Sequence, residues 1–336
     1  MKLRKILYPF SVLYDGITRL RNLAYDKEWK DSNEFEIPVI SVGNLSVGGT
    51  GKSPMIELLV ETLMEDYRVA VLSRGYKRNT KGFLEVQPTA TASEVGDEPL
   101  QFKQKFPQIT VAVCADRREG IERLKKHAEV ILLDDAFQHR KVVPAMSILL
   151  TAYDQLFLDD CLLPAGNLRE SRKGMDRANS IVVTKCPNGV AYAALQKIQF
   201  RMQLKPHQSI YFSEIRYDSH IHGKTESLPL AYLENKKFTL VTGIANPEPL
   251  LGFLKGKGLR FEHQKFRDHH HFTDKEINQL QTQEIILTTE KDFQRLKDRL
   301  DKKAMYYLPI KTKFLYKEEG AFRKEVLQFL EDYRKG

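Results

Sequence analysis

The feature that most constrains this chain is a glycine-rich segment that joins an apolar run to a helical pattern. The apolar run at 37–42 leads directly into 43–53 (GNLSVGGTGKS), and a helical apolar pattern then covers 53–64. Glycines let a backbone wrap its N–H groups around phosphate oxygens, and the positive end of a following helix adds attraction for anions. A strand, a glycine-rich turn and a helix in this order therefore predict an α/β domain that binds a phosphorylated ligand.

The segment 46–53 matches the phosphate-loop pattern G-x-x-x-x-G-K-S/T except at its first position, where Ser46 replaces glycine. We expect Lys52 to reach the β- and γ-phosphates of a nucleotide and the Ser53 hydroxyl to hold Mg²⁺. Three later glycines compensate for Ser46. The residues expected to contact the nucleotide are Ser46, Val47, Gly48, Gly49, Thr50, Gly51, Lys52 and Ser53. A glycine-rich turn with an incidental lysine is the alternative interpretation.

Further short apolar runs indicate a parallel sheet. They lie at 68–73, 110–113, 130–133, 146–150 and 180–184, with helix-like sequence between several of them. Strands that alternate with helices predict a mostly parallel sheet flanked by helices, of the P-loop NTPase type. The run at 130–133 ends in Asp134 and Asp135, a Walker B layout in which a carboxylate orients Mg²⁺. Residues 182–187 (VVTKCP) lack the aspartate of a guanine-reading loop, which favours ATP.

The second half of the chain carries its own set of strand and helix patterns. After a polar, extended stretch near 211–222, a strand is expected at 238–242, followed by alternating helices and strands up to a last helix near 319–333. We therefore expect a first domain over 27–212 and a smaller α/β domain over 213–336. The Ser/Thr/Pro-rich segment 86–96 is expected to form a surface loop.

Residues 1–26 have the pattern of a basic amphipathic helix. Its apolar positions recur every three or four residues at Ile6, Phe10, Leu13, Ile17 and Leu20, and its basic residues are Lys2, Arg4, Lys5, Arg19 and Arg21. The chain has no apolar run of the length that spans a bilayer. Such a helix either lies in an anionic membrane interface or packs on the body of the protein.

Composition narrows the class of partner. The formal net charge of +9 favours an anionic partner, such as a nucleic acid, a phosphorylated metabolite or an acidic lipid surface. No aromatic-interleaved basic motif is present, which argues against nucleic acid. Three scattered cysteines exclude a disulfide framework and a four-thiolate zinc site.

Transfer of a phosphoryl group also requires a base near the acceptor and cations for the developing charge. Asp97, within 96–99 (GDEP), is a candidate, although an aspartate there is equally typical of a helix N-cap. The histidines at 269–271 precede a Thr-x-x-Glu capping box at 273–276, so they lie on a loop at a helix entrance. A solvated loop is the other interpretation of these histidines. Further candidates after strands or within loops are Arg74, Tyr76, Arg117, Arg118, Arg169 and Glu170.

In order along the chain, the basic amphipathic start is followed by GNLSVGGTGKSP, LSRGY, VGDEP, LLDDAFQHR, LLPAGNLRE, VTGIANP, DHHHF and TTEKD. Over nearly its whole length the sequence thus resembles the tetraacyldisaccharide 4'-kinase family of Gram-negative bacteria. The resemblance implies ATP- and Mg²⁺-dependent phosphorylation of the 4'-hydroxyl of lipid A disaccharide 1-phosphate to form lipid IVA. It also implies a peripheral or monotopic enzyme at the cytoplasmic face of the inner membrane, bound to an anionic lipid surface, with no nucleic-acid partner and no obligate protein partner.

The resemblance also implies roles for individual residues. Lys52 and Ser53 match the phosphate-loop pair, and Asp134 and Asp135 match the Walker B acids. Asp97 matches the catalytic base, and His269 matches the histidine that pairs with it, with His270 as a competitor. Other active-site positions of the family are matched by Arg74, Tyr76, Glu98, Arg117, Arg169 and Glu170. A two-stranded linker is expected to join the two domains.

Two rival functions follow from the same features. A nucleotide-driven membrane switch often carries the loop K-G-G-x-G-K-S/T, but this chain has Val47 in place of the first lysine. A nucleic-acid-binding NTPase is the other rival, and it rests on the net charge alone.

Overall fold

The computed structural model describes residues 3–268, 270–301 and 304–335. The first part of the chain comprises η1 (Leu3–Leu7), α1 (Tyr8–Asp26), β1 (Val39–Asn44), α2 (Lys52–Leu63), β2 (Val69–Ser73), β3 (Leu84–Glu85), α3 (Ala92–Val95), α4 (Asp97–Lys105), β4 (Thr110–Val113), α5 (Arg117–Leu124), β5 (Val130–Asp134), β6 (Met146–Ala152), η2 (Phe157–Asp159), η3 (Arg172–Arg177), β7 (Ser180–Thr184), α6 (Tyr192–Met202) and β8 (Ser209–Tyr217). The remainder comprises β9 (His220–His222), β10 (Ser227–Pro229), η4 (Leu230–Leu233), β11 (Phe238–Thr242), α7 (Glu248–Gly256), β12 (Phe261–Lys265), α8 (Asp274–Gln281), β13 (Ile286–Thr288), α9 (Glu290–Leu296), β14 (Met305–Tyr307), β15 (Ile310–Phe314), η5 (Leu315–Lys317) and α10 (Glu319–Lys335).

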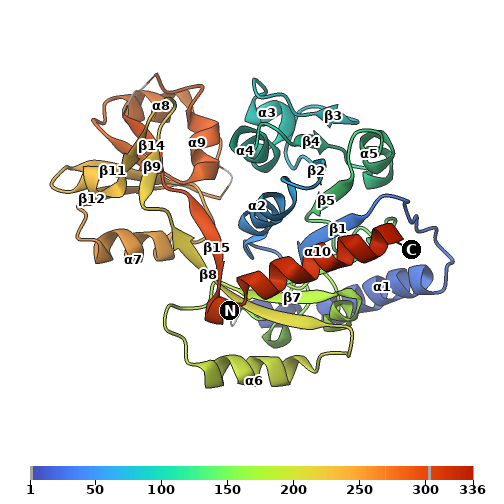
Figure 1. The fold of residues 1–336 in the computed structure, drawn as a ribbon. Helices are drawn as coiled ribbons and strands as arrows, with labels where there is room; N and C mark the ends of the chain where they lie inside the picture. The colour runs from blue at the N-terminus through green and yellow to red at the C-terminus, as the bar shows by residue number, and fades with distance from the viewer. Residues whose placement is uncertain (1–2, 269, 302–303, 336) are drawn as a thin grey trace.

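The described strands form two mostly parallel sheets flanked by helices (Figure 1). The larger sheet has nine strands in the order β15-β8-β7-β6-β1-β5-β2-β4-β3, and the smaller has six in the order β10-β9-β14-β13-β11-β12. This arrangement confirms the predicted α/β fold class. The central strands β1, β2, β5, β6 and β7 are buried along their whole length, as expected for parallel strands covered by helices on both faces.

The register of β1 and β5 positions the active-site candidates. Val42 of β1 lies opposite Asp134 of β5, and both strands are parallel. The loop that follows β1 and the carboxylates that end β5 therefore share one edge of the sheet. That edge is where ligands bind in open α/β sheets.

Two antiparallel strands, β8 and β15, connect the two bodies seen in Figure 1. β8 pairs with β7 through its first residues and with β15 through its last, so the boundary predicted at residue 212 falls inside this strand. Helix α10 then returns to the first body, where Phe322, Val326 and Leu330 share a core with residues of α2. The division of the chain into 27–212 and 213–336 stays a prediction.

The segment predicted as a surface loop at 86–96 contains the short helix α3. Thr91 and Glu94 form a capping box, in which the Thr91 backbone N–H donates to Glu94 Oε2 at 2.8 Å. The prediction was wrong over this turn because a Thr-x-x-Glu spacing satisfies the first N–H groups of a helix even within a Ser/Thr-rich stretch.

Helix α1 packs on the first body through its polar side. Ser11 and Thr18 are buried, and Ser11 Oγ donates to Leu162 O at 2.9 Å. The predicted apolar face points away from the body, and its exposed fractions are 74% for Ile6, 62% for Phe10, 65% for Leu13, 60% for Ile17 and 63% for Leu20. Packing of this face on the body, one of the two interpretations from the sequence, is therefore wrong.

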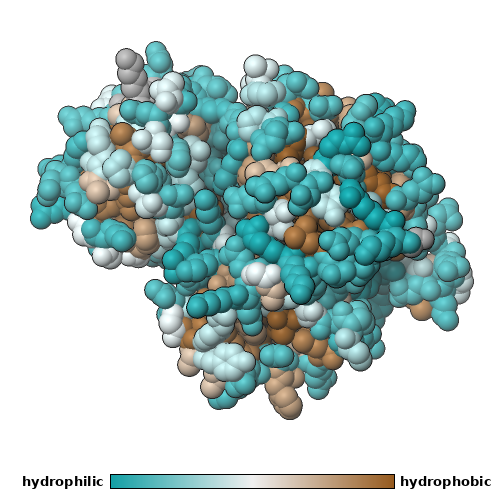
Figure 2. All heavy atoms as spheres, viewed as in Figure 1, coloured by the Kyte–Doolittle hydropathy of each residue, from teal (hydrophilic) through white to brown (hydrophobic). Residues whose placement is uncertain are grey.

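The surface seen in Figure 2 is more hydrophilic than the exposed apolar side of α1. The face shown in Figure 2 is mostly hydrophilic, whereas α1 lies at the back of that view. None of the described helices combines the length and the apolar character needed to cross a bilayer.

Candidate active site

The glycine-rich loop between β1 and α2 has the backbone shape that glycine permits. Gly48 and Gly51 have φ values of 114° and 86°, in the left-handed region, and α2 begins directly after Gly51. The loop is fastened to the end of β7, because Thr184 Oγ1 donates to Thr50 O at 2.8 Å and Lys185 donates to Gly49 O. The N–H groups at the start of α2 therefore open toward the sheet edge, as an anion site requires.

Lys52 pairs with Asp135, one of the two acids at the end of β5. Its Nζ lies 3.7 Å from Asp135 Oδ1, and Arg169 Nη2 lies 2.9 Å from the same oxygen. Burial disfavours the charged form of Asp135, but Lys52 and Arg169 outweigh it and lower the pKa of this carboxyl. Arg169 also binds Asn44 and the Ser46 carbonyl, so it ties Asp135 to the phosphate loop.

Unlike Asp135, Asp134 has few contacts that offset the cost of burying its negative charge. Ser73 Oγ donates to Asp134 Oδ2 at 3.2 Å, but Oδ1 is buried and has no hydrogen-bond partner within the described residues. Burial, together with the charges of Glu98 and Asp135, raises the pKa of Asp134 to about 7. A buried carboxylate oxygen without a partner is costly, so this atom fits a bound cation or its water ligand.

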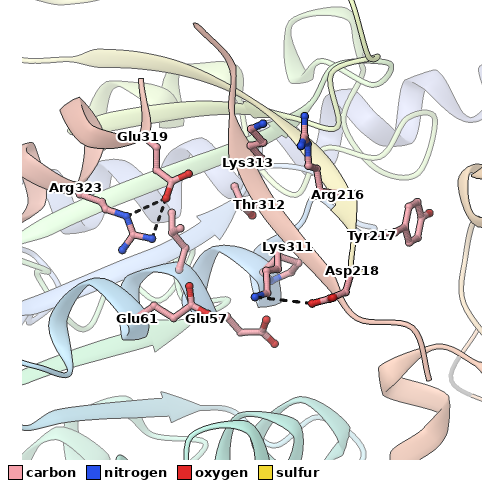
Figure 3. A pocket seen from close by; sticks show the side chains of 12 residues that line it. Glu57, Glu61, Arg216, Tyr217, Asp218, Lys311, Thr312, Lys313, Glu319 and Arg323 are labelled. Carbon is pink, nitrogen blue, oxygen red and sulfur yellow. Dashed lines mark hydrogen bonds and ion pairs between the residues drawn. The ribbon is translucent and has the colours of Figure 1, made fainter. Parts of the chain in front are cut away.

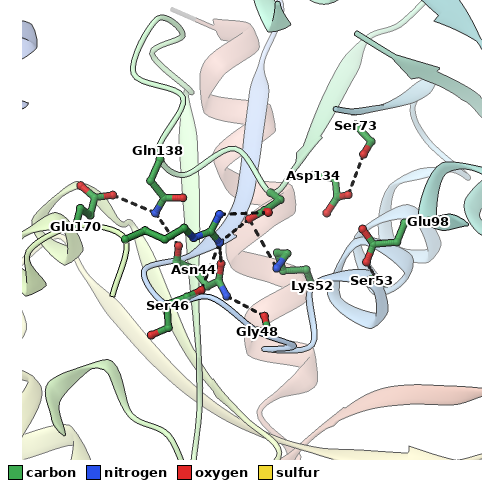
Figure 4. Close-up of polar contacts among 12 residues, drawn as sticks. Asn44, Ser46, Gly48, Lys52, Ser53, Ser73, Glu98, Asp134, Gln138 and Glu170 are labelled. Carbon is green, nitrogen blue, oxygen red and sulfur yellow. Dashed lines mark hydrogen bonds and ion pairs between the residues drawn. The ribbon is translucent and has the colours of Figure 1, made fainter. Parts of the chain in front are cut away.

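The acidic turn at 97–98 lies beside the phosphate loop (Figure 4). Ser53 Oγ donates to Glu98 Oε1 at 2.9 Å, and the same carboxylate pairs with Lys291 of α9. Burial opposes ionisation of Glu98, but Lys291 and then Lys52 outweigh it and lower its pKa to about 2. The N-cap of α4 is Gly96 and its first residue is Asp97, so the alternative interpretation of Asp97 as an N-cap is wrong. Its side chain instead pairs with Arg295, also on α9.

Lys291 and Arg295 are functional candidates that were not predicted from the sequence. Both belong to α9, a short helix that begins at Glu290 with Thr289 as its N-cap. The segment TTEKD at 288–292 was available as a signal, but its alternating charges are equally typical of a solvated helix face. Only the packing of α9 on α4 reveals that these cations point to the acids of the other body.

Two predicted residues serve the structure around the site. Arg117 is buried, and it donates to the carbonyls of Cys114 at 3.0 Å and Asp134 at 3.4 Å. Glu170 is also buried and accepts hydrogen bonds from Arg177, Gln138 and Asn22. Arg117 therefore holds the backbone at the sheet edge, and Glu170 connects side chains beneath α1.

Four further predicted residues lie away from the phosphate loop or outside the described residues. Arg74 and Tyr76 are exposed and line a hollow after β2. His270 Nε2 lies 2.9 Å from Glu276 Oε2, and the His270 ring stacks on Phe266. His269 lies outside the described residues.

A second hollow, of about 340 Å³, lies between α2, the linker strands and the start of α10 (Figure 3). Four of its charged side chains are paired with one another, in the contacts of Arg323 with Glu319 at 3.0 Å and of Lys311 with Asp218 at 4.0 Å. It contains none of the acids or cations described above. We therefore assign the active site to the edge at the phosphate loop.

Comparison with known proteins gives one consistent answer. The family model for tetraacyldisaccharide-1-P 4'-kinase matches residues 3–331. The tetraacyldisaccharide 4'-kinase of Flavobacterium johnsoniae is 47% identical over 336 residues, which cover 98% of each chain. That of Bacteroides thetaiotaomicron is 42% identical over 360 residues, covering 99% of this chain and 94% of its own. Among solved structures, LpxK from Aquifex aeolicus in complex with ATP matches with a TM-score of 0.79 and 33% identity, over 98% of this chain and 99% of that one.

Proposed function

This chain belongs to the tetraacyldisaccharide-1-P 4'-kinase family, and on this premise we propose how its own residues perform the reaction. The enzyme transfers the γ-phosphate of ATP to the 4'-hydroxyl of tetraacyldisaccharide 1-phosphate and so forms lipid IVA. One observation carries the assignment of roles. Lys52 and Ser53, at the start of α2, contact Asp135 and Glu98, which belong to two different acidic pairs at the same sheet edge.

The phosphate loop is proposed to hold the nucleotide. Residues 46–53 present backbone N–H groups and the start of α2 to the phosphates, and Lys52 supplies a cation beside them. Because Asp135, which is itself held by Arg169, pairs with Lys52, the lysine is positioned at the loop before nucleotide binds. Transfer of a phosphoryl group depends chiefly on such positioning and on charge stabilisation.

The residues present fit Mg²⁺. Asp134 offers a buried carboxylate oxygen without a partner among the described residues, and Ser53 offers a hydroxyl at the start of α2. Asp135 is the third candidate, although its oxygens already contact Lys52 and Arg169. Among the described residues, no three acidic, histidine or cysteine side chains converge as a complete metal site. Mg²⁺ usually takes only one or two carboxylate ligands from the protein, and phosphate and water oxygens complete its coordination. When bound, the ion would neutralise charge on the β- and γ-phosphate oxygens.

Asp97 is proposed as the base. It begins α4 beside Glu98, and Arg295 orients its carboxylate. Asp97 accepts the proton of the 4'-hydroxyl while the hydroxyl oxygen forms a bond to the γ-phosphorus. The bond from this phosphorus to the bridging oxygen breaks, and that oxygen leaves as part of ADP. We propose His269 as the residue that assists Asp97 in proton transfer.

Helix α1 is proposed to bind the anionic surface of the inner membrane at its cytoplasmic face. Its apolar side is exposed and its polar side is attached to the body, which is the arrangement of an interfacial helix. Arg4 of the preceding η1 and Arg21 of α1 face the body instead of the lipid, because Arg4 donates to Asn167 Oδ1 at 3.0 Å and Arg21 donates to Gln138 O at 2.7 Å. The apolar side chains therefore carry most of the proposed attachment.

The function is tested by transfer of labelled γ-phosphate from ATP to tetraacyldisaccharide 1-phosphate in mixed micelles. We expect labelled lipid to form with the wild-type chain, and water and added protein to receive little label. Release of free phosphate without labelled lipid would favour a nucleotide-driven switch instead. Asp97→Asn serves as the matched control, because it keeps the size of the side chain and removes the base.

A further inference from the structure

A hollow of about 360 Å³ follows β2, and all the charged residues that line it are positive. Nine residues line it, and four of them are the cations Arg74, Lys77, Arg78 and Lys81, while none is acidic. In the described part of the chain, Arg74, Lys77 and Lys81 have no carboxylate within ion-pair distance, although many other cations of the protein do. Like charges gathered without counter-charges repel one another, and a bound anion removes that repulsion.

The loop that forms the hollow is held in a defined shape. Arg78 Nη1 donates to Val113 O at 3.4 Å and its other nitrogen donates to Gly82 O, so this guanidinium closes the loop on itself. Gly75 and Lys77 both adopt positive φ values, of 70° and 59°. The exposed cations therefore project from a fixed turn, and this lowers the entropy lost when a ligand binds.

The same loop is attached to the segment that carries Asp97. The backbone N–H of Asn79 donates to Ser93 O at 2.8 Å, and Thr80 Oγ1 donates to Glu94 O at 2.6 Å. At Gly96 the approach is close, since an added Cβ would lie 3.3 Å from Tyr76 O. The hollow and the proposed base thus belong to one connected piece of structure.

The acceptor carries a phosphate on the sugar that does not bear the reacting 4'-hydroxyl, so this phosphate can reach a site away from the transferred group. The 4'-hydroxyl belongs to one sugar and the 1-phosphate to the other, so an acceptor with its hydroxyl at Asp97 extends its phosphate away from the transferring group. A phosphate monoester carries between one and two negative charges and three acceptor oxygens, which match arginine and lysine donors. Resting on the proposed function, we propose that the hollow lined by Arg74, Lys77 and Lys81 binds the phosphate already present on the acceptor and so selects for phosphorylated disaccharides.

The test compares two acceptors, the tetraacyldisaccharide with and without its 1-phosphate, in micelles with full-length protein. Wild-type kcat/KM is expected to fall about tenfold or more when the phosphate is removed, since hydrogen bonds to charged groups are worth that much. The double variant Lys77→Gln/Lys81→Gln should lose about as much on the phosphorylated acceptor, mainly through a higher KM. The two changes together should cost little more than either alone.

Lys126→Gln provides the matched control, because Lys126 is an exposed lysine that does not line the hollow. Thermal unfolding of each variant should match that of the wild type, and the single variant Lys81→Gln replaces the double variant if it does not. Equal losses of the double variant on both acceptors would overturn the inference. So would a wild type that uses both acceptors equally well, whereas no transfer to either acceptor would overturn the proposed function itself.

A second comparison separates the acceptor from the lipid surface as the source of the phosphate. The kinetics are repeated in micelles that contain phosphatidylglycerol or only phosphatidylcholine. If the hollow binds the acceptor, the loss caused by the double variant is the same in both lipids. A loss that appears only with phosphatidylglycerol would assign the hollow to lipid headgroups and overturn the inference.

Discussion

Arg295 of α9 holds Asp97 of α4 through two of its guanidinium nitrogens, and the Nε atom lies 3.0 Å from Asp97 Oδ2. The third nitrogen donates to Asp292 Oδ1 at 2.9 Å, and Asp292 in turn accepts the Gly243 N–H at 2.8 Å. The proposed base is therefore oriented by the body that follows the linker. The position of α9 decides how Asp97 faces the phosphate loop.

Arg295→Met is expected to lower kcat by about one to two orders of magnitude while the KM for ATP changes little. The carboxylate of Asp97 loses its orienting partner, but the phosphate loop keeps its contacts. Arg295→Lys should restore part of the rate, because it returns the charge without the two-nitrogen geometry. Steady-state kinetics measure this, with Arg201→Met as the control for loss of an exposed ion pair with Asp159. A variant that loses ATP affinity in proportion to kcat would contradict the positioning role.

His269→Ala is expected to lower kcat strongly, and the double variant with Asp97→Ala should lose much less than the product of the single losses. An aspartate has an ordinary pKa near 3.9 and needs help to take a proton at neutral pH. His270→Ala should have a smaller effect, because His270 contacts Glu276 and stacks on Phe266 at the start of α8. A silent His269→Ala with an inactive His270→Ala would move the role one residue along the chain.

Lys52→Ala and Ser53→Ala are each expected to remove most transfer activity, by roughly two orders of magnitude or more, with the fold intact. Lys52 pairs with Asp135 and Ser53 donates to Glu98, so both side chains make polar contacts and neither change opens the apolar core. Initial rates at saturating ATP and thermal unfolding are measured together. Near-normal turnover in both variants would refute the assignment of the phosphate loop.

Parts of the fold and of the site could be predicted from the sequence where a short local pattern also carries the chemistry. The phosphate loop, the positions of the buried strands along the chain and the carboxylates at 134–135 all follow from short-range spacing, because each needs only a strand and the turn that follows it. Contacts between the bodies before and after the linker leave no local pattern in the sequence. Lys291 and Arg295 reach Glu98 and Asp97 over separations of 193 and 198 residues, so only tertiary packing identifies them.

The orientation of α1 shows another limit of pattern reasoning. An amphipathic pattern states that one face is apolar, but it does not state which face contacts the body. Here hydrogen bonds from Ser11 and Tyr14 to the backbone of the 162–169 region attach the polar side. The roles of Arg117 and Glu170 were also hidden, since a charged residue that binds buried carbonyls or other buried side chains has the same sequence signature as one that binds substrate.

Leu13→Asp/Ile17→Asp is expected to reduce binding to vesicles that contain phosphatidylglycerol by at least about tenfold. Both side chains are more than half exposed on the apolar side of α1, so their loss changes the interface and not the core. Sedimentation with vesicles measures the bound fraction. Phe200→Asp is the control, because Phe200 is an exposed apolar residue on α6, with an exposed fraction of 85%. Unchanged partitioning of the double variant would refute attachment through α1.

Two buried glutamates at the seam between α2, α4 and α9 predict a pH dependence of stability. Lys105 Nζ lies 2.6 Å from Glu57 Oε2 and 3.9 Å from Glu290 Oε2, and the latter oxygen has no hydrogen-bond partner in the described chain. Burial, reinforced by the charge of Glu57, raises the pKa of Glu290 from 4.5 to about 8, although Lys105 and Lys291 oppose the shift. Between these two values the folded protein retains a proton that the unfolded chain has released.

The free energy of unfolding should therefore fall as pH rises through that window, by up to about 1.4 kcal/mol per pH unit from this group. Glu290→Gln removes the titrating group and keeps its shape. Relative to wild type, the variant should gain stability between about pH 5 and about pH 8, and urea unfolding at both pH values measures the difference. Glu65→Gln, at an exposed position, is the control. If Glu290→Gln keeps the wild-type slope of stability against pH, Glu290 is not the group that holds the proton.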